Sequence, residues 1–325
     1  MNVIVSPRVA REYGARIRGA APGAKLVVPS VRDGALAWRG DPARADVCCF
    51  SEDFWQDTHQ RRLVLPALFA IDGLRWFHTF SAGVDSPVFQ VLIDRGTLLT
   101  NSSGASAPSI AQYVLAMMLY RTKRIDEWHE QQRRHAWEPV AASELTGQTA
   151  GIVGTGAIGG EVARLARAFG MRVLGVRRSG KPARYVDEML PMRRLPSLLK
   201  RSDFVVLACP LTKETQGLIG EGELRAMKPT ATLINVARGR VVDEPALVRA
   251  LREGWIAGAC LDVFHVEPLP ADSPLWDLAN VVVTPHNSGF SPLNMERSMA
   301  IFLDNLARFA AGKKLRNLVT QAGAG

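Results

Sequence analysis

Short apolar runs alternate with longer segments along most of the chain. In residues 1–100 these runs are four to six residues long, and the segments between them are long enough for crossover helices. Strands joined by crossover helices pair in parallel, so this alternation predicts an α/β domain whose sheet is covered on both faces. The predicted strands are Asn2–Ser6, Lys25–Pro29, Asp46–Phe50, Arg75–Thr79 and Thr97–Thr100.

A polar stretch of small residues at 101–108 has the composition of a linker. We place the first domain crossing there and expect Ser109 to cap the helix that follows. Beyond it, apolar runs return with helical segments between most of them, in the number that a complete dinucleotide-binding sheet requires. These predicted strands are Thr149–Gly154, Met171–Val176, Asp203–Ala208, Ala231–Val236, Ile256–Asp262 and Val281–Thr284.

Residues 149–160 combine a short apolar strand, the motif Gly154-x-Gly156-x-x-Gly159 and the first turn of a helix. Gly154 permits the tight turn, and Gly159 allows the helix to pack closely on the strand. Gly156 has no Cβ, so a pyrophosphate can approach the backbone at the helix N-terminus. A lone glycine motif is weak evidence, but its place between a strand and a helix predicts a dinucleotide site.

The second strand of this predicted sheet ends in Arg177, Arg178 and Ser179. An Asp or Glu normally stands there, about twenty residues after the first glycine, and binds the ribose 2′-OH of NAD. Two guanidinium groups and a hydroxyl instead favour the 2′-phosphate of NADP, because charge-assisted bonds from arginine to phosphate are strong. We predict NADP, with NAD as the alternative if the arginines are simply solvated.

The formal net charge of +9 favours anionic ligands. No nucleic-acid motif accompanies it, and the densest basic cluster, in 121–134, also carries acidic residues typical of a solvated face or a subunit contact. The four cysteines form no C-x-x-C pair, and we predict no metal site. The N-terminus lacks a signal-peptide pattern and the run 110–120 is too short to span a bilayer, so we expect a cytoplasmic protein without a membrane segment.

Polar residues that could reduce a carbonyl group follow three of the later strands. Arg238 follows the fourth strand of the second series, Glu267 the fifth and His286 the sixth. Ligands of open α/β sheets bind outside the carboxyl ends of the strands, so these side chains are expected at one edge. An arginine can hold a substrate carboxylate, a histidine can supply a proton, and a neighbouring carboxylate keeps that histidine charged. From spacing alone each residue could equally be structural.

The combination of these segments resembles the D-isomer-specific 2-hydroxyacid dehydrogenase family. The similarity rests on 151–159, on 235–247, on 262–269 and on 284–289, and it extends to 81–85, 99–104 and 209–212. The Arg178-Ser179 pair and the chain length are similar to the glyoxylate/hydroxypyruvate reductase branch. This resemblance covers nearly the whole chain.

The resemblance implies roles for individual residues. Arg238, Glu267 and His286 would be the catalytic set, and Arg238 and His286 would also touch the substrate. The backbone N–H groups around Ala82, Gly83 and Val84 would bind the substrate carboxylate. Asp262 would hold the nicotinamide carboxamide, and Cys209 and Pro210 would line the cofactor. The full set of cofactor-binding residues expected from the motifs and the resemblance is Gly154, Gly156, Ala157, Ile158, Gly159, Arg177, Arg178, Ser179, Cys209, Pro210, Thr215, Val236, Ala237, Asp262, His286 and Ser288.

The resemblance also implies two doubly wound parallel-sheet domains. A discontinuous flavodoxin-like substrate domain would contain 1–101 and 290–325, and a Rossmann dinucleotide-binding domain would contain 102–289. The expected activity is the NAD(P)H-dependent reduction of a small 2-oxo acid to the D-2-hydroxy acid by a homodimer. A different class remains open, because a nicotinamide-sensing co-repressor resembles this family and keeps the same triad.

Overall fold

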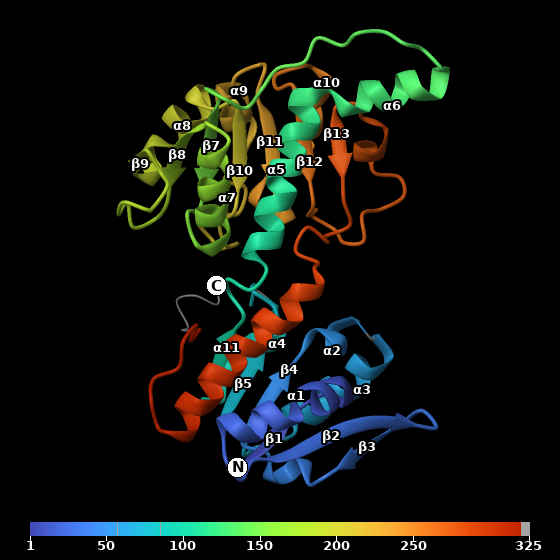
Figure 1. The fold of residues 1–325 in the computed structure, drawn as a ribbon, viewed down its shortest axis with the longest axis vertical. Helices are drawn as coiled ribbons and strands as arrows, with labels where there is room; N and C mark the ends of the chain where they lie inside the picture. Colours follow the sequence, from blue (N-terminus) through green and yellow to red (C-terminus); the bar gives the residue numbers. More distant parts are fainter. Residues whose placement is uncertain (57, 85, 320–325) are drawn as a thin grey trace. The chain divides into compact units, whose positions relative to one another are not determined.

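The computed structural model describes residues 1–56, 58–84 and 86–319 (Figure 1). The chain forms two compact units, one of Met1–Ser106 with Ser291–Gly325 and one of Ala107–Phe290. The first unit is therefore built from both ends of the chain, whereas the second is one continuous stretch. Both units are parallel-sheet α/β structures, as the alternation of strands and helices predicts.

The first unit contains a six-stranded sheet in the order β3-β2-β1-β4-β5-β6. The predicted strands are confirmed within a few residues, and every neighbouring pair from β2 to β6 is parallel. The strands are β1 Asn2–Ile4, β2 Lys25–Arg32, β3 Ala35–Arg39, β4 Val47–Phe50, β5 Trp76–Thr79 and β6 Leu98–Asn101.

β3 is an edge strand that the sequence analysis missed. It pairs antiparallel with β2, with Arg32 opposite Ala35. Between them Asp33 and Gly34 have φ angles of 48° and 76°, as in the two-residue turns that match the twist of antiparallel strands. An Asp-Gly pair is a strong signal for such a hairpin, so the expectation of a wholly parallel sheet is wrong at this edge.

The last helix of the chain completes the core of the first unit. α11 begins after Ser291, whose side chain accepts a hydrogen bond from the N–H of Leu293. Its apolar face joins the core cluster of Val3, and the ring of Phe302 stacks on Trp76 with centroids 5.3 Å apart. The helices of this unit are α1 Pro7–Ala20, α2 Glu52–Gln56, α3 Thr58–Phe69, α4 Pro87–Asp94 and α11 Pro292–Ala310.

The second unit contains a seven-stranded, wholly parallel sheet in the order β13-β12-β11-β10-β7-β8-β9. The predicted strands are confirmed, but β9 was missed because it is short and lacks β-branched residues. In the dinucleotide-binding order 3-2-1-4-5-6, β9 is the third strand and β13 is an additional seventh. The strands are β7 Thr149–Val153, β8 Arg172–Val176, β9 Glu188–Leu190, β10 Phe204–Leu207, β11 Thr232–Asn235, β12 Gly258–Leu261 and β13 Val281–Val283.

Helices cover both faces of this second sheet. Apolar residues of α5 and α7 form one core cluster with alternate strand residues such as Ile152 and Val206, and those of α8, α9 and α10 form another with Val153 and Leu207. This alternation is expected for strands that are buried on both sides. The helices are α5 Ala107–Lys123, α6 Ile125–Arg134, α7 Ala157–Ala168, α8 Leu195–Arg201, α9 Glu221–Ala226 and α10 Glu244–Arg252.

Ser109 does not cap α5, because the helix already begins at Ala107. Its hydroxyl instead donates to the backbone carbonyls of Ser288 and Phe290, at 3.1 and 3.2 Å. The expected cap is therefore wrong, and the side chain ties the start of α5 to the segment that follows β13. Within the described residues, no helix combines the length and the apolar character needed to cross a bilayer.

Candidate active site

The glycine turn between β7 and α7 is shaped by close backbone contacts. Gly154 has φ +96°, and a Cβ there would lie 2.6 Å from the backbone nitrogen of Cys209. A Cβ on Gly159 would lie 2.0 Å from the carbonyl oxygen of Gly154. At Gly156 a Cβ would meet no atom within 4 Å, so the space beside this backbone is open. The turn therefore needs two glycines for its own packing and presents the third to a ligand.

Two further observations fit a bound dinucleotide at this turn. The hydroxyl of Thr155 is buried, and none of the described residues gives it a hydrogen-bond partner. In the sheet, β7 lies between β8 and β10, where the strand order reverses and where such sheets bind their ligands. The residues present thus match the demands of a phosphate-bearing cofactor.

The other predicted cofactor residues follow the carboxyl ends of neighbouring parallel strands. Cys209, Pro210 and Thr215 follow β10, where the Thr215 hydroxyl donates to the Pro210 carbonyl at 2.7 Å. Val236 and Ala237 follow β11 and are buried. The remaining positions of the set are Ala157 and Ile158 at the start of α7, Arg177, Arg178 and Ser179 after β8, Asp262 after β12, and His286 and Ser288 after β13.

The two arginines after β8 differ in their surroundings. The guanidinium group of Arg177 donates to the carbonyls of Lys181 and Pro182, at 2.8 and 2.6 Å, and so stabilises the loop at 177–182 that follows β8. Arg178 and Ser179 are exposed. Arg178 is thus the arginine that the loop presents outward, a difference that the sequence does not reveal.

The loops that carry Arg238 and Glu267 are in backbone contact. A Cβ on Gly239 would lie 1.9 Å from the carbonyl carbon of Phe264, so only glycine allows the two loops to approach this closely. Beyond this contact the N–H of Phe264 donates to Glu267 Oε1 at 3.0 Å. Arg238 Nη1 donates to the carbonyl of Ala237 at 2.7 Å.

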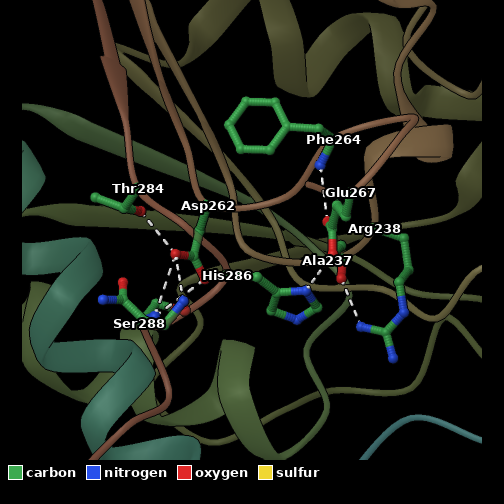
Figure 2. A network of polar contacts seen from close by, with 9 residues as sticks. Ala237, Arg238, Asp262, Phe264, Glu267, Thr284, His286 and Ser288 are labelled. Atoms are coloured by element: carbon green, nitrogen blue, oxygen red, sulfur yellow. Dashed lines mark hydrogen bonds and ion pairs between the residues drawn. The ribbon is translucent and has the colours of Figure 1, made fainter. Parts of the chain in front are cut away.

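His286 and Glu267 form a direct pair, with 2.7 Å between Nδ1 and Oε2 (Figure 2). Half of the His286 side chain is exposed. Because Nδ1 is held by the carboxylate, Nε2 is the ring nitrogen left to face a ligand. Arg238 extends into the same region, so the structure brings together the three residues predicted from separate strand ends (Figure 2).

The pair shifts the pKa of both partners toward the charged forms. The hydrogen bond to Glu267 raises the pKa of His286 above its ordinary 6.5; burial and Arg238 oppose this, and the charges of Glu267 and Asp262 assist it. Burial acts to raise the pKa of Glu267, but the bonds from His286 and Phe264 and the charges of His286 and Arg238 outweigh it and lower that pKa. The pair therefore favours an imidazolium beside a carboxylate up to a higher pH than an isolated histidine would allow.

Asp262 is buried beneath the turn that carries His286. Its Oδ1 accepts from the Thr284 hydroxyl at 2.6 Å and from the N–H groups of Asn287 and Ser288, and Ser288 also reaches Oδ2 (Figure 2). His286 itself has φ +49°, a conformation that a non-glycine residue adopts only when its surroundings fix it. The carboxylate implied to hold a nicotinamide thus also organises the histidine turn.

The hydroxyl of Thr284 lies between Asp262 and the phenol of Tyr113 on α5, with 2.9 Å between the Tyr113 and Thr284 oxygens. Sequence reasoning missed this link, because nothing local connects Tyr113 to a strand more than a hundred residues later.

Of the predicted substrate-binding residues, Arg238 and His286 lie in the second unit and the other three lie in the first. Ala82, Gly83 and Val84 belong to the loop at 81–84 that follows β5, here called the β5 loop. Asp85, the last residue of the segment quoted for the resemblance, lies outside the described residues.

Comparison with known proteins supports the class that the fold and the glycine turn define, a nicotinamide-dependent oxidoreductase. Residues 115–288 match the family described as D-isomer specific 2-hydroxyacid dehydrogenase, NAD binding domain. A glyoxylate reductase of Korarchaeum cryptofilum is 40% identical over 257 residues, which is 76% of each chain. The chain belongs to the D-isomer-specific 2-hydroxyacid dehydrogenase family.

Solved structures agree with this assignment. A D-isomer-specific 2-hydroxyacid dehydrogenase of Xanthobacter autotrophicus Py2, in complex with NADPH and MES, superposes with a TM-score of 0.81 at 31% identity, covering 100% of this chain and 99% of the other. An NADPH-dependent glyoxylate/hydroxypyruvate reductase of Sinorhizobium meliloti, in complex with NADP and sulfate, has a TM-score of 0.78 at 25% identity, with the same coverage.

Proposed function

We propose that this protein reduces a small 2-oxo acid, of the glyoxylate or hydroxypyruvate kind, to the D-2-hydroxy acid with NADPH. The observation that carries the proposal is the His286–Glu267 pair at 2.7 Å, at the same sheet edge as the glycine turn and Arg238. The glyoxylate reductases among the relatives support the substrate class. In this proposal the first unit is the substrate domain and the second binds the dinucleotide.

The proposed mechanism assigns one task to each side chain. The glycine turn and the loops after β8 and β10 hold the cofactor, which when bound supplies hydride to the substrate carbonyl carbon. Arg238 pairs with the substrate carboxylate and polarises the carbonyl, a task that suits its planar fork. His286 donates the proton on Nε2 to the carbonyl oxygen as negative charge develops there. Glu267 holds the ring through Nδ1 and keeps it protonated.

A substrate panel tests the function directly. Purified protein should oxidise NADPH, followed by loss of its absorbance, when glyoxylate, hydroxypyruvate, pyruvate or a bulkier 2-oxo acid is added, and the smaller acids should react best. A nicotinamide-sensing protein of the same fold would bind NADPH without turning it over. Binding without turnover of any 2-oxo acid would therefore favour the sensor and contradict the proposal.

We predict that Arg178→Ala lowers the preference for NADPH over NADH by about tenfold or more, since it removes charge-assisted bonds to the 2′-phosphate. The measurement is kcat/KM for both cofactors in the wild type and the variant. Arg172→Ala, at the opposite end of β8, removes the same charge and should leave the ratio unchanged. A wild type that uses NADH equally well would contradict the assignment of NADP.

We predict that Glu267→Gln moves the high-pH limb of the reduction profile to lower pH. Reduction needs protonated His286, so activity falls as pH rises through the pKa of that ring. The Glu267 carboxylate raises this pKa, and a neutral amide cannot. The pH dependence of kcat/KM for glyoxylate is the measurement. Glu244→Gln is the control, because its carboxylate accepts from the N–H of His265 rather than from His286.

We also propose a homodimer in which 121–137 forms part of the interface. Trp128 is 47% exposed on α6 and Trp137 is 99% exposed beyond it, so about half of one large apolar side chain and nearly all of the other are uncovered within this chain. Light scattering at micromolar concentration measures the mass, and a monomer would refute this arrangement.

A further inference from the structure

The β5 loop has its carbonyl oxygens bound by the protein. The carbonyl of Ser81 accepts from the N–H of Ser102 at 3.3 Å. The carbonyl of Ala82 accepts from the side-chain amide of Asn101 at 2.8 Å. The carbonyl of Gly83 accepts from the hydroxyl of Ser81 at 2.7 Å. Three successive carbonyls of one short loop are thus all satisfied from the same unit.

The N–H groups of the same loop are in the opposite situation. None of the described residues accepts a hydrogen bond from the N–H of Ala82, Gly83 or Val84. Val84 is only 8% exposed, so its N–H is poorly placed to be satisfied by bulk water. Successive backbone N–H groups that lack internal acceptors can bind an anion where the backbone turns them to one side.

One side chain fixes the direction of the central N–H group. A peptide unit is planar and trans, so its C=O and N–H point in opposite directions. The carbonyl of Ala82 and the N–H of Gly83 belong to one peptide unit, and the Asn101 amide anchors that carbonyl. By holding the oxygen, Asn101 turns the N–H of Gly83 away from the body of the unit.

The orientation of the Asn101 amide is itself fixed. Its Oδ1 accepts from the N–H of Ser103 at 3.1 Å, so its NH2 group must face Ala82. Asn317 secures the backbone beneath it, since its Nδ2 donates to the carbonyls of Asn101 and Ser103 at 3.2 and 3.1 Å. Only a side chain with one acceptor and one donor at this reach satisfies both partners.

We propose that Asn101 is a positioning residue for substrate affinity, which orients the β5 loop so that its N–H groups bind the carboxylate of the substrate. This inference rests on the proposed 2-oxo acid reduction and adds a residue outside the expected site. Asn101 touches neither the reacting atoms nor the cofactor in this assignment, so its loss acts on substrate binding more than on the chemical step.

The test uses two substitutions that differ in charge. Asn101→Asp keeps the acceptor for the N–H of Ser103 and loses the donor to Ala82, whereas Asn101→Ala loses both without adding charge. Each should raise KM for glyoxylate by roughly tenfold or more, the usual effect of weakening hydrogen bonds to a charged group. kcat should change less than KM, and the dissociation constant for NADPH should stay within about twofold.

Asn2→Asp is the matched control. It introduces the same charge in the same unit and likewise removes an amide donor, but the amide of Asn2 bonds to the backbone carbonyl of Arg44 at 2.8 Å and not to the β5 loop. Its KM for glyoxylate should stay close to the wild-type value. If only Asn101→Asp raises KM, charge repulsion explains the effect and the positioning role is wrong. An unchanged KM in both Asn101 variants also overturns it.

A binding measurement keeps this inference separate from the proposed function. Oxalate, an unreactive dicarboxylate, should shift the backbone amide resonances of Gly83 and Val84 in isotope-labelled wild type bound to NADP. The affinity for oxalate, measured from these shifts, should be roughly tenfold weaker in Asn101→Ala. Shifts without any turnover of 2-oxo acids would uphold the positioning role and refute the reductase. Turnover with wild-type oxalate affinity in Asn101→Ala would do the reverse.

Discussion

His286→Ala should lower kcat for glyoxylate reduction by about two to four orders of magnitude, the usual contribution of a general acid. Glu267 holds the His286 imidazole at Nδ1, and Nε2 is the group proposed to protonate the carbonyl oxygen. Removing the imidazole removes this proton donor. NADPH should still bind, because the glycine turn lies on a different strand end. The measurement is kcat at saturating glyoxylate, together with NADPH affinity by fluorescence.

The control for this experiment is His59→Ala, which removes an exposed imidazole from α3 in the other unit. It should leave kcat unchanged. A His286→Ala enzyme that keeps more than about a tenth of the wild-type kcat would remove His286 from the role of principal acid, given the usual size of this effect.

Arg238→Ala should lower kcat/KM for glyoxylate by about two to four orders of magnitude, because two charge-assisted bonds to the substrate are lost. Both KM and kcat should suffer, since the contact forms with the bound carboxylate and strengthens as charge develops on the carbonyl oxygen. Arg238→Lys should recover little. A lysine has a single nitrogen, which cannot both bond to the Ala237 carbonyl and present a fork to the substrate.

Arg240→Lys provides the comparison, because Arg240 is exposed on the same segment two residues later. It should behave as wild type. Equal activity of Arg238→Lys and the wild type would show that only a positive charge is needed at this position, and the forked contact would be wrong.

The sequence predicted the second unit well where local chemistry determines the structure. The turn at 154–159 was predicted correctly, because a Cβ on Gly159 would lie only 2.0 Å from the carbonyl oxygen of Gly154 and the position therefore requires glycine. The start of α11 has an equally local cause, because the side chain of Ser291 accepts a hydrogen bond from the N–H of Leu293. These features depend on a few neighbouring residues, which a sequence displays directly.

What the sequence did not reveal depends on contacts between distant segments. β9 is short and has little intrinsic preference for a strand, and its pairing with β8 defines it. The difference in surroundings between Arg177 and Arg178 arises because only the guanidinium of Arg177 bonds to the carbonyls of Lys181 and Pro182. The composition of 101–108 predicted a linker, whereas Asn101 bonds to the carbonyl of Ala82 in a loop that follows the neighbouring strand. In each case the missing information is tertiary.

The division of the chain into a continuous and a discontinuous unit has a consequence for synthesis on the ribosome. Ala107–Phe290 holds all strands and helices of its own core and can fold once that stretch has emerged. The first unit begins to be translated before the second, but it lacks the apolar face of α11 until residues 292–310 have been made. We therefore expect it to complete its core after the second unit, and during that interval the apolar residues around Trp76 lack the helix that covers them.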